Sequence, residues 1–391
     1  MDKLLSPFKQ GRLLNTLFLC NIFISFHYAL VIYINSSYLL NYFNDTQVSA
    51  LFIIGSIMDA IFLLNASRVL EKIGSYRFIF WAIIVEFLAT VGLATLSSPL
   101  LVSLCFLIHL ITISLILFNM DMFIQDIPQN RSITGSIRAT YLTTTNITIV
   151  LAPSLIALLL FKNHYSYVYV AAVVFLIPMF FLVKLLKNIK TPKVLHINIK
   201  QTLSEYIKNR DLYNVFVTQF LLQFFYAYMV VYTPIYLAKY VGFSWYEIGF
   251  MFTIMLLPFV FIEVPVGELA DLKYGEKEFL TVGFIIMGLS TIFMSFITVK
   301  VFWIWAAALF ITRIGASLVE ISSESYFFKH MGADKTDVIS FFRISRPVSF
   351  IVAPIVATLS LQFIPFQYIF IVIGSIMVLG THYSLALNDT K

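Results

Sequence analysis

The chain of 391 residues has few charged side chains, because Asp, Glu, Lys and Arg make up only 12% of it. A soluble domain of ordinary composition carries about 25%. So few charges cannot cover a water-exposed surface, which excludes an ordinary soluble protein. Hydrophobic residues make up 60% of the chain and aromatic residues 17%. The composition therefore predicts that much of the surface faces lipid.

Several kinds of chemistry lack the residues that they need. The two cysteines, Cys20 and Cys105, both stand in apolar runs, and we interpret them as buried thiols. No Gly-Lys-Ser or Gly-Lys-Thr loop is present to hold phosphates, so ATP is not the expected energy source. No group of His, Cys and acidic residues has the spacing of a metal site. We therefore expect neither a cofactor nor a metal.

Long apolar runs are abundant. A helix needs about 20 apolar residues to cross a hydrocarbon core of roughly 30 Å. Because every backbone amide in lipid must be paired within the protein, these runs are expected to be helices. The sequence predicts twelve spans, at 14–36, 47–66, 78–96, 99–122, 139–161, 165–187, 212–237, 246–267, 279–298, 302–326, 340–361 and 367–387.

The basic residues are distributed unevenly between the two sides of these spans. Of the 26 Lys and Arg residues, only Lys162, Lys239 and Lys300 fall in loops of the second side, and Arg313 lies inside a span. This asymmetry predicts that both termini and the central loop are cytosolic. The net charge of +6 is spread over many loops, which does not suggest a nucleic-acid partner. We also expect a monomer, and the compactness of the chain suggests a bacterial inner membrane.

The chain divides into two halves that resemble each other. We expect a six-helix bundle at 1–187, a cytosolic linker at 188–211 and a second six-helix bundle at 212–391. Gly74 precedes Gly275 by 201 residues, and Ala152-Pro153 precedes Ala353-Pro354 by the same 201. Parallel six-helix repeats are a transporter architecture in which the solute site lies between the halves, near the middle of the membrane.

One loop carries a recognisable motif. The segment Gly267-Glu-Leu-Ala-Asp271-Leu-Lys273-Tyr-Gly275-Glu-Lys277 resembles the G-x-L-A-D-x-x-G-x-K/R signature of the major facilitator superfamily. Its place between the eighth and ninth spans also agrees with that family. Glycine permits the tight reversal between two helices, since it adopts a positive φ without steric cost. The turn at 239–249 also looks like a loop of this family.

The resemblance implies an all-α membrane protein with twelve transmembrane helices in two pseudo-symmetric halves, and a transporter that works by alternating access. The first-half copy of the motif is degenerate: Leu70 stands where the family has aspartate, and Glu71 follows it. The glycine-rich pattern of the family's exporters is missing around Pro153. An antiporter-type exporter is therefore not supported by that motif.

The span 302–326 contains polar residues at helical spacing. Arg313, Ser317, Glu320 and Glu324 follow at intervals of four, three and four residues, which places them on one face. A charge inside the bilayer costs about 2.5–3.5 kcal/mol on insertion scales, so this face is expected to line a cavity. The alternative is a structural ion network with Arg343 and Arg346.

Other spans carry similar polar stripes. In the family that the chain resembles, the first, fourth, seventh and tenth helices line the cavity, so these stripes are candidates for solute binding. Interhelical hydrogen bonding is the alternative, and for the two histidines packing or proton transfer. The candidate solute-binding residues are Arg313, Gln219, Gln223, Tyr226, Asn21, Tyr28, His27 and His109.

Carboxylates within the spans are candidates for proton coupling. Burial favours the neutral form of a carboxyl group, which makes proton exchange possible. We select Asp59, Glu263 and Glu320. Glu86 receives little weight, because the third helix of the family is usually peripheral.

The loops at the cytosolic ends suggest a gate. By the repeat, Asp271 is expected to approach Arg138, and Glu71 to approach Arg343 and Arg346. A carboxylate at a helix N-terminus gains from the helix dipole as well as from an arginine. With Gly275 at the turn, these residues are the candidate gating residues, and their pairs would favour the outward-facing state.

Three functions remain open. The leading hypothesis is a secondary transporter of a small organic solute, possibly coupled to protons. The second is a transporter-like protein that serves as a scaffold or sensor without transport. The third, a multispan membrane enzyme, needs clustered catalytic groups at an interface, which the sequence does not offer. Uptake into proteoliposomes separates the first from the others.

Overall fold

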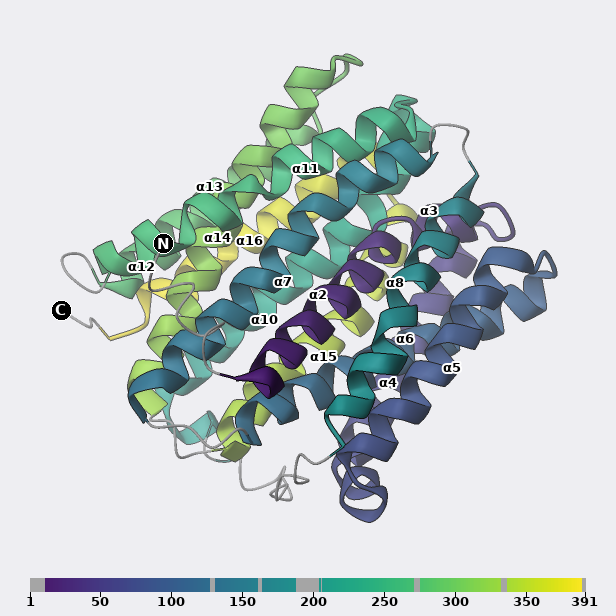
Figure 1. The fold of residues 1–391 in the computed structure, drawn as a ribbon. Helices are drawn as coiled ribbons and strands as arrows, with labels where there is room; N and C mark the ends of the chain where they lie inside the picture. Colours follow the sequence, from purple (N-terminus) through teal and green to yellow (C-terminus); the bar gives the residue numbers. More distant parts are fainter. Residues whose placement is uncertain are drawn as a thin grey trace. The chain divides into compact units, whose positions relative to one another are not determined.

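The computed structural model describes residues 11–126, 131–160, 164–187, 204, 206–270, 275–331 and 336–388, at some helical positions by the backbone alone. Within these residues the chain is helical and contains no strand. It divides into two compact units, Met1–Val194 and Leu195–Lys391 (Figure 1).

The first unit, drawn from purple to blue-green in Figure 1, contains seven described helices. They are α2 (Arg12–Ile32), the short α3 (Asn35–Leu39), α4 (Asp45–Ile73), α5 (Ser75–Thr95), α6 (Pro99–Asp126), α7 (Arg131–Leu159) and α8 (Tyr165–Leu185). The helix α2 packs against α6, α7 and α8, and α5 packs against α6 and α8. These contacts place the core of the unit between α2, α5, α6 and α8.

The second unit, drawn from blue-green to yellow, repeats this pattern. Its described helices are α10 (Arg210–Ile235), continued by a π-helical turn at Tyr236–Val241, α11 (Trp245–Phe261), α12 (Glu263–Leu269), α13 (Glu276–Met294), α14 (Phe302–Met331), α15 (Thr336–Leu361) and α16 (Ile369–Leu385). The helix α13 packs against α14 and α16, and α10 packs against α14, α15 and α16.

The described helices match the twelve predicted spans. Eleven are long and apolar enough to cross a membrane, and Thr144–Leu159 is a shorter apolar helix at the position of the fifth span. That span is shorter than the predicted 139–161, because α7 begins at Arg131 with a polar first half. The predicted all-α, twelve-span organisation is confirmed.

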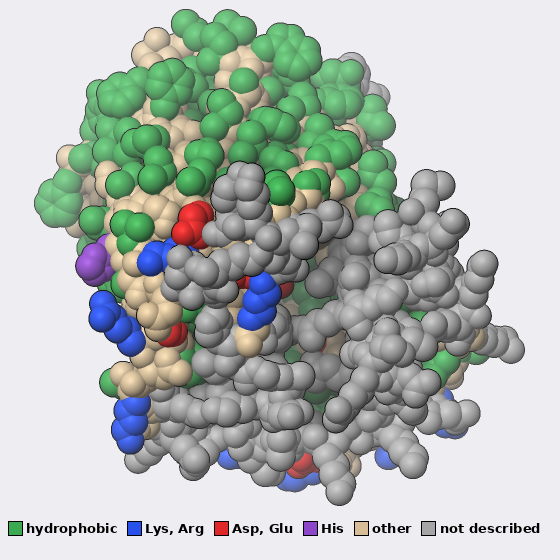
Figure 2. Space-filling model, turned by 90° about the vertical axis from the view of Figure 1, so that its left-hand side faces the viewer, with side chains coloured by type: hydrophobic (Ala, Val, Ile, Leu, Met, Phe, Trp, Pro, Cys, Tyr) green, Lys and Arg blue, Asp and Glu red, His purple; other side chains and the backbone are tan. Residues whose placement is uncertain are grey.

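The surface is as apolar as the composition predicts. Figure 2 shows one face on which hydrophobic side chains form a broad continuous area, while charged side chains gather beside it and below it. Large exposed hydrophobic residues include Trp81 at 60%, Leu88 at 62%, Phe181 at 65% and Trp303 at 70%. An exposed apolar area of this kind is expected of a protein that is embedded in a membrane.

Two glycines form equivalent turns in the two units. Gly74 has a φ of 84° and precedes α5, and Gly275 has a φ of 81° and precedes α13. A side chain is strained at such a φ, so both turns require glycine. The predicted role of Gly275 as a turn residue is confirmed, and the equal conformations support the repeat.

Close contact between helices in the second unit depends on small residues. A Cβ atom added at Gly315 would lie 2.4 Å from the Met287 amide nitrogen and 2.6 Å from the Gly283 carbonyl oxygen. Gly288 and Gly374 make the same kind of backbone approach between α13 and α16. Small residues allow helices to pack closely in membranes, where lipid offers no hydrophobic driving force between them.

Replacing Gly315 by alanine is expected to destabilise the protein by about 1–3 kcal/mol, because backbone atoms cannot move aside as a flexible side chain can. The matched control is Gly267→Ala, since a Cβ there meets only Ile321, at 3.5 Å. Thermal unfolding in detergent measures both variants. Equal unfolding midpoints for the two variants would contradict the close packing of α13 and α14.

Candidate functional site

A buried arginine stands in the middle of the second unit. Arg313 on α14 is only 2% exposed. The Cζ atom of its guanidinium lies 5.1 Å from the ring centroid of Phe225 and 5.4 Å from that of Tyr226, both on α10. A cation over an aromatic face is attracted by the ring quadrupole. The predicted position of Arg313 away from the lipid surface agrees with this burial.

Two turns further along α14, Glu320 faces the same part of α10. The Tyr226 hydroxyl donates a hydrogen bond of 2.6 Å to Glu320 Oε2. The carboxylate interacts electrostatically with Glu324, Arg313 and Arg346. Arg346 lies on α15, so part of the ion network expected from the sequence is present. The polar face of α14 and the adjoining Arg346 of α15 therefore combine two cations and two carboxylates.

The amide of Gln219 belongs to the same helix pair. Ser323 on α14 donates a hydrogen bond of 3.0 Å to Gln219 Oε1 on α10, and both residues are buried. Gln223 lies one turn beyond Gln219 and is half-buried. Residues three or four apart share a helix face, which explains why the polar residues of α10 and α14 meet. We call this set, Gln219, Gln223, Tyr226, Arg313 and Glu320, the α10–α14 site.

The α10–α14 site offers both hydrogen-bond donors and acceptors. A guanidinium and an amide donate, and carboxylate and amide oxygens accept. The aromatic rings of Phe225 and Tyr226 add apolar faces next to these polar groups. Such an arrangement suits a small polar molecule, and few polar groups among apolar neighbours are typical of ligand sites.

The candidate residues of the first unit have other contacts. The Asn21 amide nitrogen lies 2.9 Å from the Tyr141 carbonyl oxygen, 2.8 Å from Thr144 Oγ1 and 2.9 Å from Thr145 Oγ1. Asn21 therefore links α2 to α7. Tyr28 is half-buried and packs against the apolar core of this unit.

The two histidines meet a residue that received little weight from the sequence. His27 on α2 and His109 on α6 both contact Glu86 on α5, and all three side chains are buried. The third helix was expected to be peripheral, yet Glu86 points inward and is 0% exposed. The signal for it was present: two histidines near the middle of their spans need a partner, and Glu86 is a carboxylate at similar depth.

The remaining candidates lie apart from these groups or outside the described residues. Asp59 on α4 accepts a hydrogen bond of 2.9 Å from Ser114 on α6. Glu71 and Arg346 are exposed, and Gly275 is buried. The side chains that lie outside the described residues are those of Glu263, Asp271, Arg138 and Arg343. The gating pairs stay predictions.

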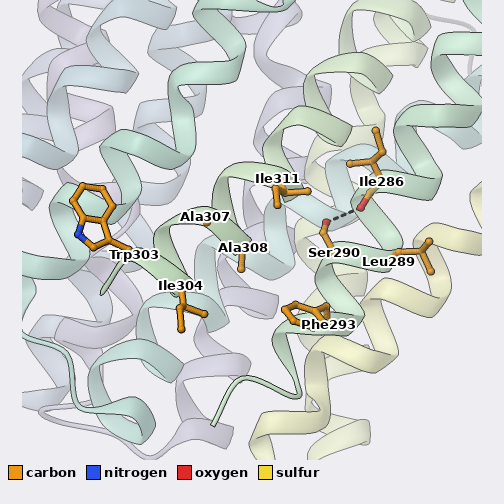
Figure 3. Close-up of a pocket in the computed structure, with 9 residues that line it drawn as sticks. All are labelled: Ile286, Leu289, Ser290, Phe293, Trp303, Ile304, Ala307, Ala308 and Ile311. Atoms are coloured by element: carbon orange, nitrogen blue, oxygen red, sulfur yellow. Dashed lines mark hydrogen bonds between the residues drawn. The ribbon is translucent and has the colours of Figure 1, made fainter. Parts of the chain in front are cut away.

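An apolar groove of about 680 Å³ lies between α13 and α14. Figure 3 shows its lining, which includes Leu289, Phe293 and Trp303. Its polar group, the Ser290 hydroxyl, bonds the Ile286 carbonyl oxygen at 2.6 Å. Leu289, Phe293 and Trp303 are among the most exposed hydrophobic residues, so the groove faces lipid and is not a site for a polar solute.

Comparisons with known proteins agree with this architecture. The profile of the Major Facilitator Superfamily matches residues 17–261 and 215–387. A search of curated protein sequences gives no match. The crystal structure of the nucleoside transporter NupG is similar, with a TM-score of 0.74 and 11% identity over 96% of this chain and 99% of that chain.

The crystal structure of a NupG mutant gives a TM-score of 0.76 at 12% identity, again over 96% of this chain and 99% of that chain. Identities this low show the fold alone. The profile, in contrast, matches nearly the whole chain, and the helices, the repeated glycine turns and the motif at 267–277 agree with it. The chain belongs to the Major Facilitator Superfamily.

Proposed function

We propose that the protein is a secondary transporter whose solute binds at the α10–α14 site. The observation that carries this proposal is the hydrogen bond of 2.6 Å from Tyr226 to Glu320, with the guanidinium of Arg313 against the same tyrosine ring. Charged groups inside membrane helices are costly, and in transporters they mark substrate or ion pathways. Asn21, His27 and His109 are engaged in contacts within the first unit, so we leave them outside the solute site.

The solute that fits best is small, polar and without net charge. The two cations, Arg313 and Arg346, balance the two carboxylates, Glu320 and Glu324, and a charged solute would disturb that balance. The neighbouring aromatic rings favour a solute with a flat or apolar part. Nucleosides, sugars and zwitterionic amino acids meet these conditions. NupG is a nucleoside transporter, which makes nucleosides the first class to test.

Coupling to protons is part of the proposal. Among the carboxylates predicted for this role, Glu320 is the one at the solute site, where a proton and a solute would influence each other. Asp59 and Glu263 stay candidates. An imposed pH gradient is expected to increase uptake into proteoliposomes, and uptake that is indifferent to the gradient would indicate a facilitator.

The proposal also covers the orientation, the membrane and the oligomeric state of the protein. The basic loops favour cytosolic termini, and a bacterial inner membrane and a monomeric state are the simplest expectation. We propose no enzymatic activity and no nucleic-acid partner. Accessibility of single cysteines placed in the loops near Lys162 and Lys239 tests the orientation.

The function is tested in two steps. A thermal-shift panel of nucleosides, sugars and amino acids on the purified protein identifies a solute that binds. Uptake of that solute into proteoliposomes then measures transport. Binding without uptake would favour the alternative function of a sensor without transport.

A further inference from the structure

Three ionisable side chains meet inside the first unit, at the centre of the helix bundle. They come from three different helices: His27 from α2, Glu86 from α5 and His109 from α6. Their exposed fractions are 0%, 0% and 2%. We call them the His–Glu–His cluster. The α10–α14 site does not include these residues, and three buried ionisable groups in contact need an explanation.

A single carboxylate oxygen joins the two imidazole rings. Glu86 Oε1 lies 2.6 Å from His27 Nε2 and 2.5 Å from His109 Nδ1. Thr90 Oγ1 lies 3.2 Å from the same oxygen, and the Thr112 hydroxyl bonds the other oxygen, Oε2. These hydrogen bonds tie α2, α5 and α6 together through one side chain.

The hydrogen bonds determine where protons can lie. His27 Nδ1 is 3.0 Å from the Ala172 carbonyl oxygen of α8. A carbonyl oxygen only accepts hydrogen bonds, so Nδ1 carries a hydrogen. In a neutral ring, Nε2 is then an acceptor, and the short contact to Glu86 requires a proton on the carboxyl group. If instead that proton moves to Nε2, the pair is an imidazolium and a carboxylate.

In both arrangements the contact between His27 and Glu86 contains one transferable proton. His109 donates from Nδ1 to the same carboxyl oxygen, so its ring can be neutral or can accept a further proton. The cluster therefore has states that differ by one proton while its heavy atoms keep the same hydrogen-bonded neighbours. Histidine has an unperturbed pKa near 6.5, and a neighbouring carboxylate is the partner that makes a buried imidazolium tolerable.

The other helices add no competing charge among the described residues. The charges that act on Glu86 are those of His27 and His109. The helix α8 contributes the Ala172 carbonyl, and the Asn21 contacts of α2 lead to α7. On α4, Asp59 accepts a hydrogen bond from Ser114, and the charges that act on Glu86 do not include it. When the His–Glu–His cluster gains or loses a proton, its own net charge therefore changes.

The distances favour a proton over a metal ion. The three ligand atoms lie within 4.8 Å of one another, so the donor types suit a metal. Atoms bound to zinc at about 2.1 Å would however be separated by roughly 3.4 Å in tetrahedral geometry. The contacts of 2.5 and 2.6 Å are hydrogen-bond lengths and leave no space for an ion between the atoms.

We propose that the His–Glu–His cluster is an intramembrane proton-binding site, and that its proton takes part in the coupling to transport beside that of Glu320. Protonation changes the charge of the group whose hydrogen bonds hold α2, α5 and α6 together, and so connects proton binding to helix packing in this unit. The coupling role rests on the proposed transport function, whereas proton binding by the cluster does not.

Ring-nitrogen NMR of ¹⁵N-histidine-labelled protein in lipid nanodiscs tests proton binding without any solute. The chain has six histidines. The variants His27→Gln and His109→Gln assign the signals of the cluster, and His382→Gln, at an exposed position on α16, is the matched control. We expect the signals of His27 and His109 to titrate together in the parent protein. Signals of both rings that do not change with pH would overturn the proposal.

The variant Glu86→Gln tests the carboxylate. Without a counter-charge the buried rings are expected to stay neutral, so their joint titration should disappear, while Asp59→Asn should leave it in place. Persistence of the titration in Glu86→Gln would overturn the role of Glu86. If this variant does not fold, the titration of the parent protein still decides the question. One zinc ion retained per parent chain and lost in Glu86→Gln would replace the proton site by a metal site.

The coupling role is tested separately with the solute that the binding panel selects. For each variant, uptake under an imposed pH gradient is divided by its own uptake without a gradient. This ratio is expected to be several times greater than one in the parent and to fall to one in Glu86→Gln. An unchanged ratio together with a normal histidine titration in the parent would overturn the coupling but keep the proton site. If neither the parent nor any variant takes up the solute, the proposed transport function is rejected instead.

Discussion

Replacement of Arg313 by glutamine is expected to lower transport roughly ten- to hundredfold, because a hydrogen bond to a charged group contributes about 1.5–3 kcal/mol. The guanidinium is buried against Phe225 and Tyr226, and glutamine can replace neither its charge nor its stacking. Arg313→Lys keeps the charge but loses the planar fork, so an intermediate loss is expected. The measurement is kcat/KM for uptake into proteoliposomes.

The matched control for Arg313 is Arg68→Gln, which removes an exposed arginine of α4. Its effect on transport is expected to stay within about twofold, as for most exposed substitutions. Unfolding midpoints of both variants separate a loss of function from a loss of fold. Near-normal transport by a stable Arg313→Gln protein would remove Arg313 from the solute site.

Tyr226 and Glu320 act as a pair, so their substitutions are expected to be strongly non-additive. Tyr226→Phe and Glu320→Gln each remove or weaken the hydrogen bond of 2.6 Å, and each is expected to lower kcat/KM about tenfold or more. The double variant should be little worse than the more affected single variant. A coupling free energy of roughly 1–3 kcal/mol follows from such a double-mutant cycle.

A second cycle supplies the control for this pair. Glu278 is exposed in the first turn of α13, so Glu278→Gln should combine with Tyr226→Phe without coupling. If the effects of Tyr226→Phe and Glu320→Gln simply multiply as well, the hydrogen bond between them has no part in transport.

Much of the fold follows from simple patterns in the sequence. The spans are visible because lipid requires long apolar helices, and the described helices agree with them. Gly74 and Gly275 could be paired because only glycine adopts the positive φ that both turns require. Arg313, Glu320, Gln219 and Tyr226 could be grouped because helical spacing places them on the facing sides of two helices.

Other features depend on helix rotation, which hydropathy does not reveal. Glu86 lies in a span with few polar residues, and family position suggested a peripheral helix; its inward direction follows from the packing of α5 against α6 and α8. Asn21 has the spacing of a cavity-lining residue, yet its amide bonds α7. A polar stripe can face a solute or a neighbouring helix, and the sequence alone does not distinguish them.

The central claim, that the solute binds at the α10–α14 site, is tested most directly by solute protection of a cysteine at position 223. Gln223 is half-buried and lies on the stripe of α10 between Gln219 and Tyr226. In a background in which Cys20 and Cys105 are replaced by alanine, Gln223→Cys is labelled with a maleimide, and Ser290→Cys in the lipid-facing groove is the control. The account predicts that the transported solute slows labelling at 223, with half-protection near the KM of transport, and leaves labelling at 290 unchanged. Labelling at 223 that a saturating, transported solute does not slow would contradict it.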